Sequence, residues 1–218
     1  MTAPSLRPAL DAGLAALDLP LDETQRTRLL AHLALIAKWN QVYNLTAVRD
    51  PAQMLTQHLL DCLAVVGPLR RHLASRDAPA RLLDVGSGAG LPGAVFAIAC
   101  PTQLAATCVD TVSKKAAFIG QVAAELGLSN LTGLHARIEA LTGPFDLISS
   151  RAFATLADFV AGSRQALAPG GVWLAMKGKL PTDEIAALPA DVEVFHVEPL
   201  AVPSLQAQRC IVWMRKRA

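Results

Sequence analysis

An acidic residue followed by four glycines is the part of this chain best suited to bind a small molecule. The segment reads Asp84-Val85-Gly86-Ser87-Gly88-Ala89-Gly90-Leu91-Pro92-Gly93, and it follows an apolar run. We expect a buried strand, a tight turn and then the first turn of a helix. Glycine allows the main chain to approach a ligand closely, and the start of a helix offers free N–H groups. The segment therefore predicts a loop that binds a nucleotide-like cofactor.

Two classes of cofactor are compatible with these glycines. The spacing Gly88-x-Gly90-x-x-Gly93 matches the dinucleotide fingerprint, in which a pyrophosphate lies against the start of a helix. Asp84 argues against a pyrophosphate, because a carboxylate at the end of the strand would face the incoming anion. It suits a ligand that carries a cation or a hydroxyl group. The pattern Asp-x-Gly-x-Gly-x-Gly resembles motif I of the S-adenosylmethionine-dependent methyltransferases, whose ligand carries an ammonium and a sulfonium.

Asp110 provides a second carboxylate, at the end of the next expected strand. A carboxylate in this place accepts hydrogen bonds from ribose hydroxyls, both in nicotinamide enzymes and in methyltransferases. Asp110 therefore predicts a ribose contact without distinguishing the two cofactors. The alternative is that it caps the helix expected from Ser113.

Further candidates follow the third and fourth expected strands. Ile138 and Glu139 come after the third strand, where an apolar residue and an acid would pack against a purine and hydrogen-bond to it. The alternative, equally compatible with the spacing, is that Glu139 is an ordinary surface glutamate whose side chain faces solvent. Arg151 ends the fourth strand, and there it would hold the carboxylate of the cofactor or an RNA phosphate.

Motifs of other nucleic-acid methyltransferases are missing after the fourth strand. The sequence has no Asn/Asp-Pro-Pro-Tyr/Phe segment there, which counts against methylation of an exocyclic amine. It also lacks the Thr-Cys and Pro-Cys nucleophiles of the cytosine carbon-5 enzymes.

Composition sets wider bounds. Of the 218 residues, 52% are hydrophobic, which is enough for a sizeable core, and the net charge of +2 permits nucleic-acid binding without demanding it. The four cysteines have no metal-like or redox-like spacing, so we expect free buried thiols and no metal site. Asp11 and Asp18 interrupt the apolar residues near the start, which argues against a signal peptide and favours the cytoplasm.

Residues 1–75 are expected to form a helical cap. Asp22 and Gln25 have the spacing of a capping box, and apolar residues recur after them at helical intervals. A second helix is expected from Pro51, because proline suits the first turn. Residues 75–79 are polar and end in proline, which predicts a joint to a cofactor-binding domain over residues 76–218.

Strands and helices alternate after this joint, which is typical of an α/β fold with a mostly parallel sheet and helices on both faces. The expected strands are 81–85, 104–109, 131–135, 145–149, 171–176, 192–197 and 209–214. The expected helices are 91–99, 113–127, 155–168 and 181–187. No helix separates the last two strands, so they are expected to form an antiparallel hairpin. Seven strands with a reversed last pair match the Rossmann-like methyltransferase sheet better than a six-stranded dinucleotide fold.

The motifs together resemble the bacterial ribosomal RNA small subunit methyltransferase G family, also called GidB. The likeness spans nearly the whole chain, and its Asn-Leu-Thr, Leu-Pro-Gly and Ser-Arg-Ala-Phe segments are the more specific parts. It is carried by Trp39-Asn40, Asn44-Leu45-Thr46, Arg49-Asp50-Pro51, His58, Asp61, Asp84 to Gly93, Ser150-Arg151-Ala152-Phe153 and Lys177-Gly178. One small departure is Cys62, where the family pattern has serine.

The resemblance implies methyl transfer from S-adenosylmethionine to N7 of a guanine in small-subunit ribosomal RNA. It places cofactor contacts at Gly86, Leu91, Ile138, Glu139 and Arg151. Four further candidates for cofactor binding come from the residues themselves. Asp84, Gly88 and Gly90 belong to the glycine segment, and Asp110 ends the next expected strand. Guanine N7 has a lone pair and no proton, so no general base is required and no catalytic residue is assigned.

The expected partner is small-subunit ribosomal RNA, within the subunit or an assembly intermediate, and the protein is expected to act as a monomer without a membrane. Basic residues near strand ends are candidates for RNA contact, although any one of them is also compatible with ordinary surface charge. They are Arg49, Lys114, Lys115, Lys177, Lys179 and Arg215-Lys216-Arg217. The stretch around Asn44 and His58 is compatible with a helical lid over the pocket, and the alternative is that Trp39 and His58 are core anchors.

Two other functions remain open at this stage. The glycine spacing is compatible with a nicotinamide-dependent oxidoreductase, and the resemblance is compatible with a ribosome-assembly factor that binds the cofactor without turnover.

Overall fold

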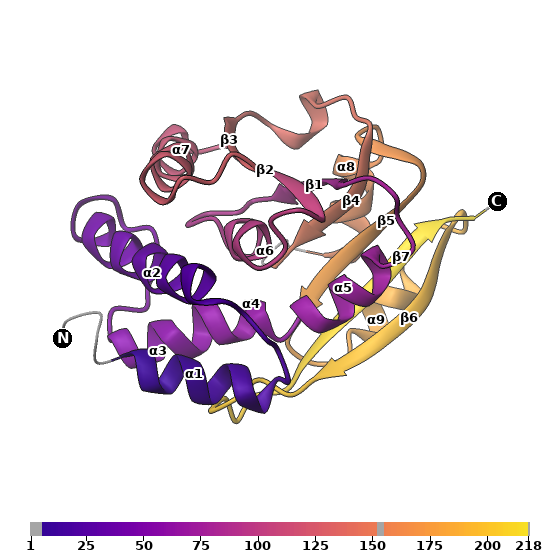
Figure 1. The fold of residues 1–218 in the computed structure, drawn as a ribbon. Coiled ribbons are helices and arrows are strands. Elements are labelled where there is room, and N and C mark those ends of the chain that lie inside the picture. Colours follow the sequence, from indigo (N-terminus) through magenta and orange to yellow (C-terminus); the bar gives the residue numbers. More distant parts are fainter. Residues whose placement is uncertain (1–5, 152–154, 218) are drawn as a thin grey trace.

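A computed structural model of the protein describes residues 6–151 and 155–217. One seven-stranded sheet crosses the molecule in the order β3-β2-β1-β4-β5-β7-β6 (Figure 1). The strands are β1 (Ala80–Val85), β2 (Leu104–Asp110), β3 (Leu131–His135), β4 (Phe145–Ser150), β5 (Leu167–Lys177), β6 (Val192–Leu200) and β7 (Arg209–Lys216). Strands β1 to β5 pair in parallel, and β7 is antiparallel to both β5 and β6. The predicted sheet with a reversed last pair is confirmed.

Helices precede the sheet in the chain. They are α1 (Arg7–Ala16), α2 (Glu23–Tyr43), α3 (Pro51–Met54), the π-helical turn η2 (Leu55–Leu60), α4 (Asp61–Leu63) and α5 (Val66–Leu73). The capping box is confirmed, because the Asp22 side chain accepts from Gln25 N and the Gln25 side chain accepts from Asp22 N. Pro51 begins α3 as expected, with Asp50 as the N-cap.

The remaining helices connect the strands. They are α6 (Gly93–Ala99), α7 (Ser113–Leu126), the 3₁₀ turn η3 (Ile138–Ala140), α8 (Leu156–Ser163) and α9 (Thr182–Ala186). The prediction of a helix through residue 168 is wrong, since α8 ends at Ser163. Leu167 is buried and already pairs with Phe145 of β4, so the segment after α8 gains more from the sheet than from another helical turn.

The two faces of the sheet bury separate hydrophobic clusters. Leu82 and Leu174 belong to the cluster shared with α1 to α7, whereas their neighbours Leu83 and Trp173 belong to the cluster shared with α8. This alternation follows from the two-residue period of a strand. In Figure 1 the helices α2 and α4 lie beside α6, with α1 and α3 further from the sheet, and α7 and the β6–β7 hairpin lie at opposite ends of the molecule. The helices before the sheet therefore share a core with it, and their division from residues 76–218 stays a prediction.

The four cysteines are free and buried, as expected. Across residues 6–151 and 155–217, no group of histidine, cysteine and acidic side chains has the arrangement of a metal site. No helix in those same ranges is long and apolar enough to cross a membrane.

Gln25 attaches the helical segment to the sheet layer. Its Nε2 donates to Ile98 O at 3.0 Å and to Ala99 O at 3.1 Å, at the end of α6.

We predict that Gln25→Leu lowers the free energy of unfolding by about 1–3 kcal/mol, because it leaves a buried carbonyl without its donor and removes half of the capping box. Urea unfolding measures this change. The exposed Gln121→Leu is the control, and equal stabilities of the two variants would contradict the prediction.

Candidate functional site

The glycine segment forms a loop between β1 and α6. Gly86, Gly88 and Gly90 have positive φ angles of 66°, 56° and 76°. Ser87 O accepts from Gly90 N at 2.8 Å and from Leu91 N at 2.9 Å, which closes the turn. A Cβ added at Gly86 would meet nothing within 4 Å, so the main chain there borders open space. The expected close approach of the backbone to a ligand is therefore available at this glycine.

Asp84 lies under the loop and does not face a ligand. Its side chain is fully buried, and its Oδ2 accepts from Gly93 N at 2.9 Å. Ser149 of β4 donates its hydroxyl to Asp84 Oδ1 at 2.8 Å. The expectation of a carboxylate exposed to the ligand is therefore wrong for this side chain. Asp84 is the last but one residue of a strand with neighbours on both sides, so its carboxyl meets the adjacent strand and the helix start instead of solvent.

The environment of Asp84 changes its acidity. Burial raises the pKa of its carboxyl to about 7, although the hydrogen bonds from Gly93 and Ser149 act in the opposite direction. Close to neutral pH, this carboxyl therefore exchanges its proton while it holds the loop.

A cleft of about 560 Å³ opens beside the loop, at the carboxyl ends of β1, β2 and β3. Its volume is that of an ordinary small-molecule site. The walls combine backbone, charged and apolar surface, and they include Gly86, Asp110, Lys115, Ile138 and Glu139. The structure thus brings together four of the candidates expected to bind a cofactor, although they come from three different strand ends.

Asp110 is almost fully buried at the floor of this cleft. Its Oδ2 accepts from Gly88 N at 3.0 Å and its Oδ1 accepts from Val112 N at 2.9 Å. Lys115 Nζ lies 3.8 Å from Asp110 Oδ2. Each carboxylate oxygen has a further lone pair, so Asp110 both fixes the glycine loop and retains acceptor capacity toward the cleft. The alternative role as a helix cap is not realised, because Val112 is the N-cap of α7 and no side chain caps this helix.

Ile138 and Glu139 differ in exposure. Ile138 is buried, whereas the Glu139 side chain is 57% exposed and lies 3.5 Å from Arg137 at its closest atoms. Both border the cleft. An apolar wall beside a reachable carboxylate fits the face and the polar edge of a purine.

Four other candidates do not line this cleft. Gly88 donates its N–H to Asp110, Gly90 packs near Ala94 and His32, and Leu91 is buried. The fourth is Arg151, at the end of β4. The cofactor contacts expected for these four residues stay predictions. Gly88, Gly90 and Leu91 help to form the turn itself.

Arg151 belongs to a cluster that joins three distant segments. Its Nη1 donates to Gln57 O at 2.8 Å and lies 3.4 Å from Asp61 Oδ2. The other oxygen of Asp61 accepts from Arg209 Nε at 2.8 Å. The Asp61 side chain is only 5% exposed, so one buried carboxylate holds two arginines. Asp61 was selected only through the family resemblance, and Arg209 was not selected, because nothing in the spacing shows that the start of β7 comes within reach of Asp61.

Ser149 and Ser150 were not selected as site residues from the sequence, although Ser150 belongs to a segment that carries the family resemblance. Both are buried at the end of β4, where they form a pair of small polar residues that closes an apolar run. Ser150 Oγ has no hydrogen-bond partner among the described residues. A buried hydroxyl of this kind favours a polar ligand at the same strand end.

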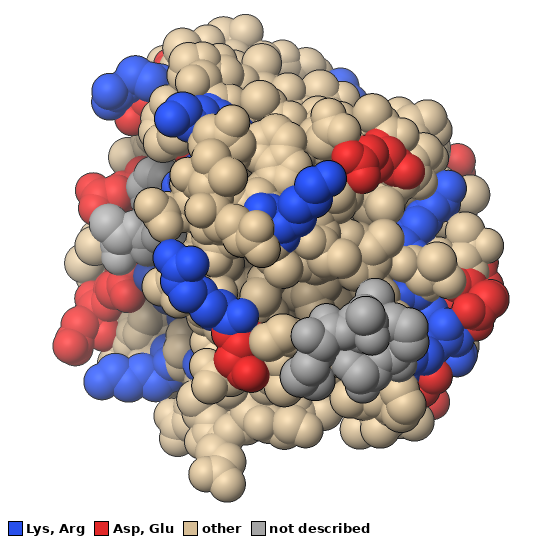
Figure 2. Space-filling model, turned by 90° about the vertical axis from the view of Figure 1, so that its left-hand side faces the viewer, with Lys and Arg blue, Asp and Glu red and all other residues tan. Residues whose placement is uncertain are grey.

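The basic candidates for RNA contact are dispersed. Lys177 is paired with Glu184 at 2.7 Å, and Lys114 Nζ lies 5.3 Å from the centre of the Tyr43 ring. Arg49 donates to Asn44 Oδ1 at 3.3 Å. On the face drawn in Figure 2, the blue side chains are separated by uncharged residues and by red acidic ones. These contacts show no single basic patch, and the RNA roles stay predictions.

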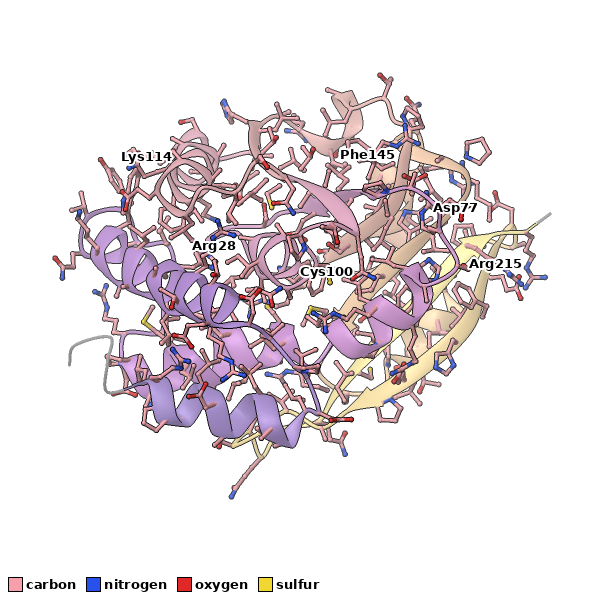
Figure 3. The ribbon with its side chains drawn as sticks, viewed as in Figure 1. Arg28, Asp77, Cys100, Lys114, Phe145 and Arg215 are labelled. Atoms are coloured by element: carbon pink, nitrogen blue, oxygen red, sulfur yellow. The ribbon has the colours of Figure 1, made fainter. Side chains whose placement is uncertain are left out.

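Trp39 and His58 pack into the protein. Trp39 lies against Phe118 of α7, with the ring centres 5.3 Å apart. His58 is buried, and its Nε2 lies 2.9 Å from Thr46 Oγ1. A second contact joins α2 to α7, because Arg28 of α2 points toward the end of α7 and donates to Gly127 O at 3.3 Å (Figure 3). This supports the interpretation of both residues as core anchors.

The sequence is similar to a known family over most of its length. Residues 25–212 match the family model GidB, described as rRNA small subunit methyltransferase G. The protein named Ribosomal RNA small subunit methyltransferase G from Acidovorax ebreus is 68% identical over 217 residues, which are 97% of this chain and 96% of that protein. The protein of the same name from Paracidovorax citrulli is 62% identical, over 100% of this chain and 93% of its own length.

Solved structures share the fold at lower identity. A SAM-dependent methyltransferase from Aquifex aeolicus has a TM-score of 0.55 at 15% identity, covering 76% of this chain and 98% of its own. A SAM-dependent methyltransferase from Geobacter sulfurreducens, in complex with S-adenosyl-L-homocysteine, has a TM-score of 0.51 at 15% identity, with coverages of 72% and 90%. These likenesses show the α/β methyltransferase fold.

Gly93 is the loop position with the least room. An added Cβ would overlap Cys108 Sγ and lie 2.9 Å from Asp84 Cβ. We predict that Gly93→Ala lowers the free energy of unfolding by about 1–3 kcal/mol, because the buried neighbours must move apart. Gly120→Ala on α7 is the control, since a Cβ there meets nothing within 4 Å. Urea unfolding measures both variants, and Cys108→Ala should restore part of the loss. No recovery in the double variant would contradict this account.

Asp84 predicts a specific dependence of stability on pH. Its pKa is about 7 in the folded protein against an ordinary value of 3.8, so the folded state holds the proton more tightly. This contribution is fully present below about pH 4 and is lost as the pH rises through about 7, by up to about 1.4 kcal/mol per pH unit. In Asp84→Asn this slope should disappear. Urea unfolding across this range measures it, and equal slopes in both proteins would refute the assignment.

Proposed function

Because the chain belongs to the rRNA small subunit methyltransferase G family, we propose that it methylates small-subunit ribosomal RNA, at N7 of a guanine, with S-adenosylmethionine as the methyl donor. The observation that carries this proposal is the cleft at the carboxyl ends of β1 to β3. There an open glycine backbone, a buried carboxylate and an apolar wall meet. This combination fits an adenosine group, and the volume accommodates it.

Individual residues have distinct parts in holding the donor. Asp110 offers acceptors to ribose hydroxyls, Ile138 packs against the adenine, and Glu139 accepts from its amino group. Gly86 allows the main chain to lie close to the ligand because it has no Cβ. Arg151 and the Ser150 hydroxyl lie at the end of β4, where they offer hydrogen-bond donors to the carboxylate of the methionine part.

Methyl transfer to guanine N7 depends on the positioning of the reactants more than on proton transfer. S-adenosylmethionine, when bound, supplies a methyl group activated by a sulfonium. Guanine N7 presents a lone pair without a proton, so the protein does not have to supply a general base. Its contribution is to align the two reactants and to exclude water. Asp84 supports this alignment indirectly, since it fixes the start of α6 against β4.

The setting of the reaction follows from the proposed substrate. The RNA substrate lies within the small subunit or an assembly intermediate. The protein acts on it as a monomer in the cytoplasm. Among the basic candidates for RNA contact, Lys115 borders the cleft, and we propose that its ammonium meets an RNA phosphate near the donor.

Asp110 provides the test of the donor. We predict that the wild-type protein binds S-adenosylmethionine and not NAD(H), and that Asp110→Ala raises the Kd for S-adenosylmethionine about tenfold or more, because it removes charged acceptors from the cleft. Isothermal titration measures the affinities. Asp77→Ala is the control, since Asp77 is exposed and lies far from the cleft at the start of the sheet (Figure 3). Binding of NAD(H) alone would favour an oxidoreductase.

Turnover is tested with labelled donor. Small subunits that lack the modification should accept radiolabelled methyl groups from the wild-type protein, and the product should be N7-methylguanine. No incorporation despite intact donor binding would favour a ribosome-assembly factor without turnover.

A further inference from the structure

A second groove lies at the other half of the sheet, at the end of β5, and is separated from the candidate cleft by the end of β4. It has a volume of about 450 Å³ and opens between the segment after β5 and the two ends of the β6–β7 connection. Its apolar lining includes Leu180, Val197, Pro199 and Leu200. Leu180 is 56% exposed, so it is accessible to a ligand in the groove. This surface could cover the flat face of a nucleobase or a ribose.

The charged lining of the groove is entirely basic. Lys179 and Arg209 are the two charged residues among those that border it. Lys179 is exposed, and no hydrogen bond or ion pair joins its ammonium to any other described residue. Of the acidic residues near the groove in sequence, Glu184 pairs with Lys177 and Glu198 pairs with Arg71, whereas the exposed Asp183 forms no ion pair with a described residue. The residues that line the groove include no acidic side chain, so an anion there would meet positive charge.

Two hydrogen bonds hold the Arg209 side chain in place. The buried Asp61 accepts from Arg209 Nε at 2.8 Å, and Arg209 Nη1 donates to Gln208 O at 2.9 Å. Its Nη2 makes no such bond to the described residues, so one end of the guanidinium remains available. An arginine held in this way loses little side-chain freedom when it binds a phosphate.

Asp61 also connects this groove to the methyl-donor side. The same carboxylate lies 3.4 Å from Arg151 Nη1, at the end of β4. In the sheet, Ser150 pairs with Ala175, so β5 continues past the donor side directly into Lys179. An RNA strand whose guanine reaches the donor would therefore pass over this groove with a neighbouring nucleotide.

We propose that the groove binds a nucleotide adjacent to the target guanine, with its phosphate on Lys179 and Arg209 and its base or ribose against Leu180. The inference rests on the proposed function and names the part of the substrate held outside the donor cleft. Apolar contact to a base face and cationic contact to a phosphate are the usual elements of single-strand recognition.

A matched pair of charge reversals tests the phosphate contact. Lys179→Glu should lower kcat/KM for small subunits about tenfold or more and reduce the slope of log kcat/KM against log salt by about one, because one phosphate contact is lost. Its Kd for S-adenosylmethionine should stay unchanged. Arg76→Glu makes a matched charge reversal on an exposed residue before β1, at the opposite edge of the sheet, and should retain wild-type values because Arg81 still pairs with Asp146. Equal kcat/KM in both variants would overturn the inference.

Crosslinking identifies the occupant without relying on turnover. A photoreactive benzoylphenylalanine at Leu180 should crosslink to small-subunit RNA near the methylated guanine, whereas the same group at the exposed Asp77, before β1, should not. Crosslinks to ribosomal protein alone would overturn the inference in favour of a protein partner. Absence of methyl transfer by the wild-type protein would refute the proposed function, and the crosslink would still decide whether the groove meets RNA.

Discussion

At the end of β1, the two carboxyl oxygens of Asp84 accept hydrogen bonds from Gly93 N and from the Ser149 hydroxyl. These contacts join the first strand to the start of α6 and to the neighbouring strand β4. Because the carboxyl is fully buried, a partner that moved away would leave a polar group without compensation. The glycine loop between these anchors therefore has little freedom, and its open side is presented toward the cleft.

Asp61 has a similar part at the other half of the sheet. It lies in the helical segment before the sheet, and it binds Arg151 after β4 and Arg209 at the start of β7. The helices thus do more than cover one face of the core, since they also fix charged side chains at the edge where the ligands are proposed to bind. The proposed cofactor side and the proposed RNA groove therefore each contain an arginine that the same buried carboxylate holds.

The elements of the fold could be predicted from local patterns, with one clear exception. Alternating apolar strands and helices indicated seven strands and the final hairpin, but α8 was extended into residues that pair with β4. Asp110, Ile138 and Glu139 were identified from their places after strands, and they do meet at one cleft. Asp84 was recognised but given the wrong orientation, because a strand-end position does not reveal which neighbours will cover it.

By itself, the sequence determined the order of the elements, the glycine loop and the family, since periodicity, turn residues and motifs are local properties of the chain. Only the tertiary structure decided which side chains face the ligand cleft and which are buried under it. It also brought Asp61 and Arg209 together, although 148 residues separate them in the chain. Such a contact depends on which strands become neighbours, and that is settled by packing of the whole sheet and its helices.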